Sequence, residues 1–122
     1  MKDKKLEERA KELHQLIPNI VARNRVTIAV LQTQTEMVIV GTSERELRAL
    51  QRKALLENEI EAESTDKNHA EENVIAKAKE LGLKGLEIGA SRPICLDCED
   101  LIKQEGIIPQ TELKGKKSKN RQ

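Results

Sequence analysis

The chain has 122 residues, which suits one domain, and its 22 Lys and Arg nearly balance its 21 Asp and Glu. This balance does not demand a nucleic-acid partner, and no apolar run approaches the roughly 18 residues that a membrane span needs. No positively charged start leads into an apolar stretch, so we expect no secretory signal. The chain has no Phe, Tyr or Trp, so its core has to be aliphatic and the usual rings for stacking on a base are absent.

The first part of the chain predicts a helix followed by two strands. Apolar residues at helical spacing predict an amphipathic helix over 3–17, ended by Pro18. The β-branched run 26–31 predicts a strand buried on both faces. After the polar turn 32–36, the run 37–41 predicts its antiparallel partner.

Two helices are expected in the middle of the chain. Ser43, with Glu46 three positions later, forms a capping-box pattern, so a helix is expected to begin there and to continue within 42–60. A polar loop over 61–68 separates it from a helix over 69–81, whose apolar residues share one face and which Gly82 ends.

The last part predicts a strand, a helix and a short edge strand. The strand lies within 83–91 and the helix spans 95–105. A further short strand is expected within 106–113, at a sheet edge because Pro109 cannot donate to a ladder. The expected fold is therefore α/β, a mixed sheet of about four to five strands with helices packed on it in two or three layers.

Two short stretches carry residues suited to metal chemistry. Cys95 and Cys98 are too few for a disulfide framework, and their spacing places both thiols on one side of a helix. If the helix that begins near His69 packs beside theirs, the three side chains supply three metal ligands. The fourth tetrahedral position then stays open, as in a catalytic zinc site. The helix N-termini are expected to favour both thiolates, and Glu71 is placed to move a proton of the zinc water.

Other interpretations of these residues stay open. The set could be a coincidence, or the two cysteines could form a redox pair. A structural zinc would need a fourth protein ligand, for which Asp97, Glu99 and His14 are the candidates. Glu71 alone could be a first-turn residue that the helix dipole favours.

The order of these motifs points to a family. His-x-Glu followed by Pro and Cys-x-x-Cys is the signature of zinc-dependent base deaminases. The segment "HAEENVIAKAKELGLKGLEIGASRPICLDC" closely resembles the cytidine-deaminase-like zinc deaminases. It looks most like the deaminase domains at the C-termini of bacterial polymorphic toxins. The segments "RNRVTIAVL", "VIVGTSERELRALQRKAL" and "GIIPQTELK" are also similar to theirs, so the likeness covers roughly 23–114.

The resemblance implies a cytidine-deaminase-like fold for residues 1–113, followed by a basic, disordered tail over 114–122. It implies a Zn²⁺ ion bound by His69, Cys95 and Cys98, with Glu71 as the proton shuttle. The residues that it implies in contact with the base are Thr42 and Ser43 after the second strand, Ala70 beside the first ligand, and Ser91, Arg92 and Pro93 before the cysteines.

The chain also departs from the family pattern. Ile94 stands between Pro93 and Cys95, where the superfamily commonly has Pro directly before the first Cys. Most relatives stack the flipped base on an aromatic ring, so Leu, Ile, Val, Met37 or His14 would have to serve here. Little of the chain follows the last helix, which leaves small room for the fifth strand of larger deaminases.

The implied reaction is hydrolytic deamination of cytosine to uracil in DNA, by attack of zinc hydroxide at C4 with loss of ammonia. Single strands are favoured because the base must leave its stack, although duplex DNA remains an alternative. A deaminase of free cytidine or a related nucleoside and a non-catalytic zinc-stabilised binding module are the other hypotheses. The resemblance further implies a monomer, an immunity protein as a partner, no membrane association, and a cytoplasmic site of action after delivery from a secreted toxin parent.

Overall fold

The computed structural model describes residues 4–64 and 68–114 of the chain. It is an α/β fold with a five-stranded mixed sheet in the order β3-β2-β1-β4-β5, compatible with the fold that the resemblance implies. The helices are α1 (Lys5–His14), α2 (Ile20–Arg23), α3 (Ala49–Ala54), α4 (Ala70–Glu80) and α5 (Leu96–Gln104), and the strands are β1 (Ile28–Thr33), β2 (Val38–Thr42), β3 (Glu59–Glu61), β4 (Gly85–Ala90) and β5 (Ile108–Pro109).

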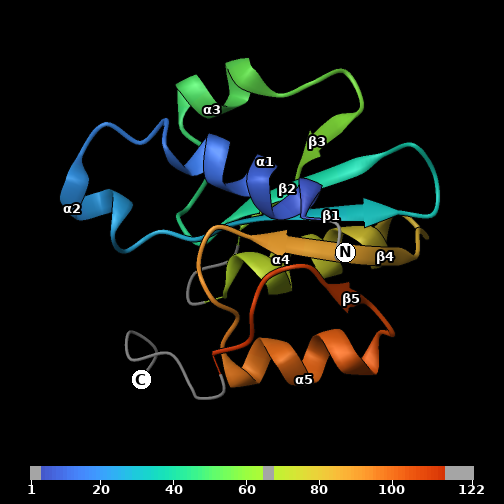
Figure 1. The fold of residues 1–122 in the computed structure, drawn as a ribbon. Helices are drawn as coiled ribbons and strands as arrows, with labels where there is room; N and C mark the ends of the chain where they lie inside the picture. Colours follow the sequence, from blue (N-terminus) through green and yellow to red (C-terminus); the bar gives the residue numbers. More distant parts are fainter. Residues whose placement is uncertain (1–3, 65–67, 115–122) are drawn as a thin grey trace.

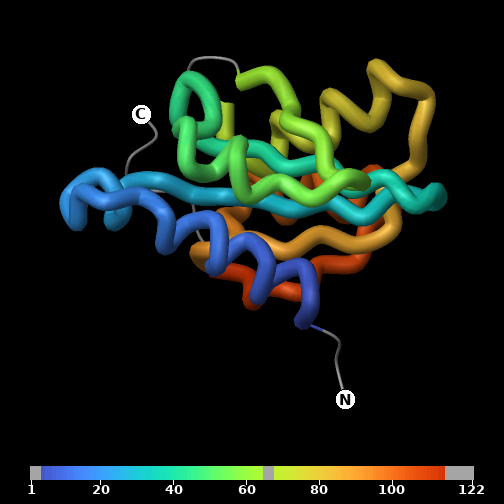
Figure 2. Tube along the Cα trace, turned by 90° about the horizontal axis from the view of Figure 1, so that it is seen from above, coloured from blue at the N-terminus to red at the C-terminus, as the bar shows by residue number. Residues whose placement is uncertain are grey.

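The helices cover both faces of the sheet, which makes three layers (Figure 1). Strand β1 lies at the centre, antiparallel to both β2 and β4. Its side chains alternate between two aliphatic cores: Ile28 and Val30 pack with α1 and the segment around α3, and Ala29 and Leu31 pack with α4 and α5. Seen from above, α1 runs obliquely across the strands (Figure 2).

Two glycines allow the helices to approach the sheet closely. A Cβ at Gly41 of β2 would lie 2.7 Å from Val74 Cγ1 of α4, and a Cβ at Gly89 of β4 would lie 2.2 Å from the backbone nitrogen of Glu7 in α1. The two glycines therefore set how near α4 and α1 lie to their opposite faces of the sheet.

Most predicted elements are confirmed. The double burial of β1, its antiparallel pairing with β2, and the edge position of β5 at Pro109 agree with the sequence analysis. Helix α1 ends at His14 rather than at residue 17, because the chain tightens into turns there. Asp3, which the predicted helix included, and the tail after Lys114 lie outside the described residues.

The prediction of a capping box at Ser43 is wrong. Ser43 Oγ accepts a hydrogen bond from the N–H of Thr27 (2.9 Å), and the Glu46 carboxylate pairs with Arg52. The helix begins six residues later at Ala49, where Gln51 Oε1 accepts from the N–H of Arg48 (2.9 Å). Tertiary pairing thus takes up the side chains that would otherwise have capped a helix at Ser43.

Two short elements, α2 and β3, were not predicted from the sequence. Strand β3 occupies residues expected in the end of a helix and the start of a polar loop, and it pairs in parallel with β2. Strand β3, in the segment before α4, therefore brings the sheet to five strands. No helix within the described part of the chain is long and apolar enough to cross a membrane.

Candidate metal centre

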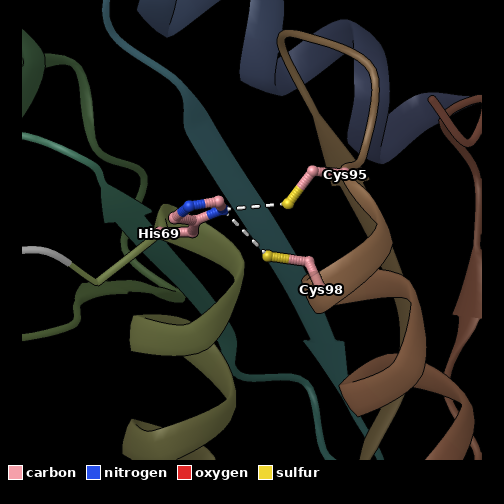
Figure 3. A group of neighbouring side chains, drawn as sticks. All are labelled: His69, Cys95 and Cys98. Carbon is pink, nitrogen blue, oxygen red and sulfur yellow. Dashed lines mark hydrogen bonds between the residues drawn. The ribbon is translucent and has the colours of Figure 1, made fainter. Parts of the chain in front are cut away.

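His69, Cys95 and Cys98 come together between the first turns of α4 and α5 (Figure 3). His69 precedes α4 as its N-cap, Cys95 precedes α5 in the same way, and Cys98 is the third residue of α5. His69 Nδ1 lies 3.2 Å from the Sγ atom of each cysteine. The three ligand atoms all lie within 4.8 Å of one another, so this group could hold a metal ion.

Helix α4 is held against the sheet where β2 ends. The Asn73 side-chain amide donates to the carbonyl oxygen of Thr42 (3.1 Å), and both residues are buried. Together with the close approach at Gly41, this hydrogen bond places the first turn of α4, and therefore His69, over the end of β2. Sequence reasoning did not single out Asn73, although its position four residues after His69 puts it on the same side of the helix.

The segment before α5 is fixed by backbone hydrogen bonds. The Ile94 N–H donates to the carbonyl of Glu112 (3.0 Å), and the Lys114 N–H donates to the carbonyl of Ile94 (2.6 Å). Ile94 itself is fully buried in the core beneath α4 and α5. Ile94, which departs from the deaminase pattern, is therefore held in the core directly before Cys95.

The candidates for a fourth protein ligand do not join this group. Within the described residues the group holds the His and two Cys alone. Glu99 pairs with Lys103 (2.7 Å), Asp97 is exposed, and His14 Nε2 lies 2.6 Å from the Arg23 carbonyl. His14 is the last residue of α1, which covers the other face of the sheet. Three protein ligands leave a coordination position for water or substrate.

Glu71 lies in the first turn of α4 and is 3% exposed. Burial raises the pKa of its carboxyl group to about 7, a hydrogen bond with its own backbone N–H lowers it, Glu72 raises it, and Arg92 lowers it. A carboxyl group with a pKa near neutrality can both take up and release a proton at physiological pH. Glu72 differs, because its carboxylate turns back to the N–H of His69.

The expected effect of the helix N-terminus on the Cys98 thiolate is opposed by burial. Burial raises the pKa of the Cys98 thiol far above its ordinary value, and the nearby charges of Glu71 and Cys95 act in the same direction. A cation among the ligands would supply the charge that makes the thiolate favourable.

The residues expected to contact a base gather at the same end of the sheet. Ala70 and Thr42 are fully buried, Ser43 and Pro93 are exposed, and Ser91 and Arg92 are half-buried. Ser43 Oγ and Ser91 Oγ accept hydrogen bonds from the N–H groups of Thr27 and Ile28, both 2.9 Å long. Their hydroxyls therefore already hold the start of β1 in place.

Other expected features lie elsewhere. Met37 precedes β2 at the far end of the β1–β2 hairpin, so neither it nor His14 on the opposite face offers a platform beside His69. A surface hollow of about 710 Å³ lies at that far end and is lined by Gln32, Thr35, Glu36, Glu57 and Asn58. Comparisons of the chain with protein-family models, with curated proteins and with solved structures found no match.

Proposed function

We propose that this chain is a zinc-dependent hydrolytic deaminase that converts cytosine to uracil in DNA, as a toxin-type deaminase domain. The observation that carries the proposal is the meeting of His69, Cys95 and Cys98 around one point with the buried carboxyl group of Glu71 in the same helix turn as His69. The order of these residues matches the signature of zinc-dependent base deaminases.

The donor set fits zinc. One imidazole nitrogen and two thiolates are typical zinc ligands, and bond lengths of ~2.1 and ~2.3 Å at a tetrahedral angle would separate N and S by about 3.6 Å. The 3.2 Å distances from His69 Nδ1 to the two Sγ atoms are within a few tenths of an ångström of that value. Small rotations of the three side chains would therefore admit the ion.

The protein residues would divide the chemistry among them. Zn²⁺, when bound, supplies the Lewis acidity that makes water a nucleophile near neutral pH. Glu71 would take a proton from that water and deliver it to the leaving amino group. The C4–N bond of cytosine breaks, a C4–O bond forms with the oxygen of water, and ammonia leaves.

The substrate is inferred from different observations than the reaction. The choice of a polynucleotide as the substrate rests on the likeness to toxin deaminase domains, because the net charge of +1 does not favour a polyanion. Single-stranded DNA is preferred because the target base must leave its stack, and the chain has no Phe, Tyr or Trp to insert into a duplex. The proposal includes a monomeric protein that acts in the cytoplasm of a target cell and is neutralised by an immunity protein.

Deep sequencing of DNA tests the reaction directly. A mixed pool of single- and double-stranded DNA is incubated with zinc-loaded protein and, in parallel, with the Glu71→Gln variant. We expect C-to-T changes that are concentrated in single strands and reduced at least 10²-fold by the substitution, the usual contribution of general acid–base catalysis. The variant keeps the shape of Glu71 and all three metal ligands, so its zinc content should not change.

Other outcomes would correct the proposal. A-to-G changes that depend on Glu71 would retain the mechanism and replace the base. An unconverted DNA pool, with conversion of free cytidine, would replace the polymer with a nucleoside. Absence of conversion for every substrate by protein that holds zinc would leave a zinc-stabilised binding module.

A further inference from the structure

The described arginines fall into two groups. Arg9, Arg48 and Arg52 pair with carboxylates, and Arg23 donates to the carbonyl of Ile17. The side chains of the other three form no ion pair or hydrogen bond with any residue in 4–64 or 68–114; these are Arg25, Arg45 and Arg92. Arg25 and Arg45 are exposed, and Arg92 is half-buried.

These three arginines lie around one end of the sheet. The Thr27 N–H donates to Ser43 Oγ, and the Ser91 N–H donates to the carbonyl of Ile28 (3.0 Å or less), so the start of β1 lies between the ends of β2 and β4. Arg25 is two residues before Thr27, Arg45 is two residues after Ser43, and Arg92 follows Ser91 directly.

The metal-ligand cluster, made of His69, Cys95 and Cys98, lies at the same end of the sheet. Thr42, the last residue of β2, accepts a hydrogen bond from Asn73 in α4, which begins just after His69. Cys95 follows Arg92 by three residues, and the guanidinium of Arg92 acts electrostatically on Glu71. The three arginines therefore lie on three separate loops at the end of the sheet that also holds His69, Cys95 and Cys98.

The acidic residues of these loops are largely engaged. Glu44 pairs with Arg48 (2.8 Å), and Glu46 pairs with Arg52 (2.9 Å). Asp97 in the first turn of α5 and Glu112, whose carbonyl oxygen accepts from the Ile94 N–H, are exposed carboxylates that pair with none of the three arginines. Arg25, Arg45 and Arg92 are therefore not neutralised by the carboxylates of their own loops, although the whole chain is nearly neutral.

We infer that Arg25, Arg45 and Arg92 contact the backbone phosphates of a single-stranded polynucleotide on either side of the base at the metal centre. Guanidinium groups bind phosphate oxygens with two parallel hydrogen bonds, and three such groups on separate loops suit a strand that crosses the site. Contacts of this kind hold the strand in register without reading its sequence. A free nucleoside carries no phosphate and would gain nothing from them.

This inference rests on the proposed function for its location, but its test does not need turnover. Zinc-loaded Glu71→Gln protein is titrated into a fluorescently labelled single-stranded DNA of mixed sequence at several salt concentrations. Phosphate contacts on single strands change log Kobs by roughly −0.7 per contact for each unit of log salt. We expect Arg25→Ala, Arg45→Ala and Arg92→Ala each to make the slope shallower by about 0.7, with weaker binding at low salt.

Lys53→Ala and Lys84→Ala are the matched controls. Each removes one exposed positive charge: Lys53 lies in α3, and Lys84 lies in the loop before β4, at the other end of the sheet. We expect both to leave the slope unchanged. Slopes that fall equally for the arginine and lysine variants would overturn the inference, because nonspecific charge would then explain binding.

The two proposals can fail separately. Cytosine conversion at an undiminished rate in all three arginine variants, with unchanged salt slopes, would refute the phosphate contacts and leave the reaction standing. Shallower slopes in the arginine variants, without conversion by the parent protein, would support the binding surface and refute the reaction. Arginine variants that weaken binding of duplex DNA alone would overturn the assignment to a single strand.

Discussion

The carboxylate of Glu72 accepts a hydrogen bond from the backbone N–H of His69, with an N···O distance of 2.6 Å. This is one half of a capping box, in which the third residue of a helix satisfies the N–H of the residue before it. Because His69 is also the first of the three candidate metal ligands, the same bond holds the backbone from which its imidazole projects.

Replacement of Glu72 should therefore weaken metal binding. Glu72→Ala removes the acceptor and is expected to cost about 1 kcal/mol of stability. It should also lower zinc affinity by roughly 10-fold or more, as is usual for residues that orient a ligand. Glu72→Gln retains an acceptor and should keep near-normal affinity, measured by competition with a chromophoric chelator. Equal affinities for the two variants would count against this role.

Metal should stabilise the folded chain through its three ligands. At zinc concentrations about 100-fold above Kd, binding contributes about 2.7 kcal/mol, which corresponds to a rise in Tm of roughly 10 °C for a domain of this size. Thermal denaturation with and without a chelator measures this rise. Cys98→Ser should abolish it, while Lys84→Ala, whose side chain lies at the other end of the sheet, should keep it.

Gly41 predicts a steric effect with a defined rescue. In Gly41→Ala the new methyl group would lie 2.7 Å from Val74 Cγ1 and 3.2 Å from the Ala70 carbonyl oxygen. Helix α4 must then shift, so we expect a loss of roughly 1–3 kcal/mol, measured by urea denaturation, and weaker zinc binding. Val74→Ala in the same chain removes the nearer contact and should restore part of both losses. A double-mutant cycle without coupling would show that this contact does not limit the packing.

Acid should weaken the ion pair between Arg9 and Glu59. Burial tends to raise the pKa of Glu59, but hydrogen bonds from Arg9 and from the Leu56 N–H outweigh it and lower the pKa below its ordinary value. A lowered folded-state pKa contributes stability above the unfolded value near 4.5, and this contribution is lost as the pH falls through the folded value.

The free energy of unfolding, measured between pH 6 and pH 3 in roughly half-unit steps, tests this sign. Glu59→Gln should show a smaller loss of stability on acidification than the parent chain. Arg9→Ala should be destabilised by roughly 1–3 kcal/mol at neutral pH, because it leaves a buried carboxylate without its partner. A loss on acidification that is the same in parent and Glu59→Gln chains would contradict the assignment.

The sequence predicted the meeting of His69, Cys95 and Cys98 better than the packing that positions them. His69, Cys95 and Cys98 have fixed spacing within short motifs, and the strand between them has a clear hydrophobic pattern, so their meeting follows from two helices on one sheet face. The closeness of that meeting depends on Gly41 and Asn73, whose roles appear only when α4 is set against β2.

The segment between β2 and α4 was harder to predict for physical reasons. Ser43 and Glu46 carry a local helix signal, but hydrogen bonds and ion pairs with distant residues take up both side chains. The three residues of β3 are too few to show a strand period, and their pairing depends on the free edge of β2. Local patterns fail here because the competing partners are remote in sequence.

The wholly aliphatic character of the two cores also has a spectroscopic consequence. Because the chain has no Tyr or Trp, the folded protein absorbs almost no near-ultraviolet light. Charge-transfer bands from Cys95 and Cys98 to a metal such as Co²⁺ would therefore stand on a nearly blank background. Absorbance alone would therefore follow metal binding at His69, Cys95 and Cys98, without a label and without correction for tyrosine or tryptophan.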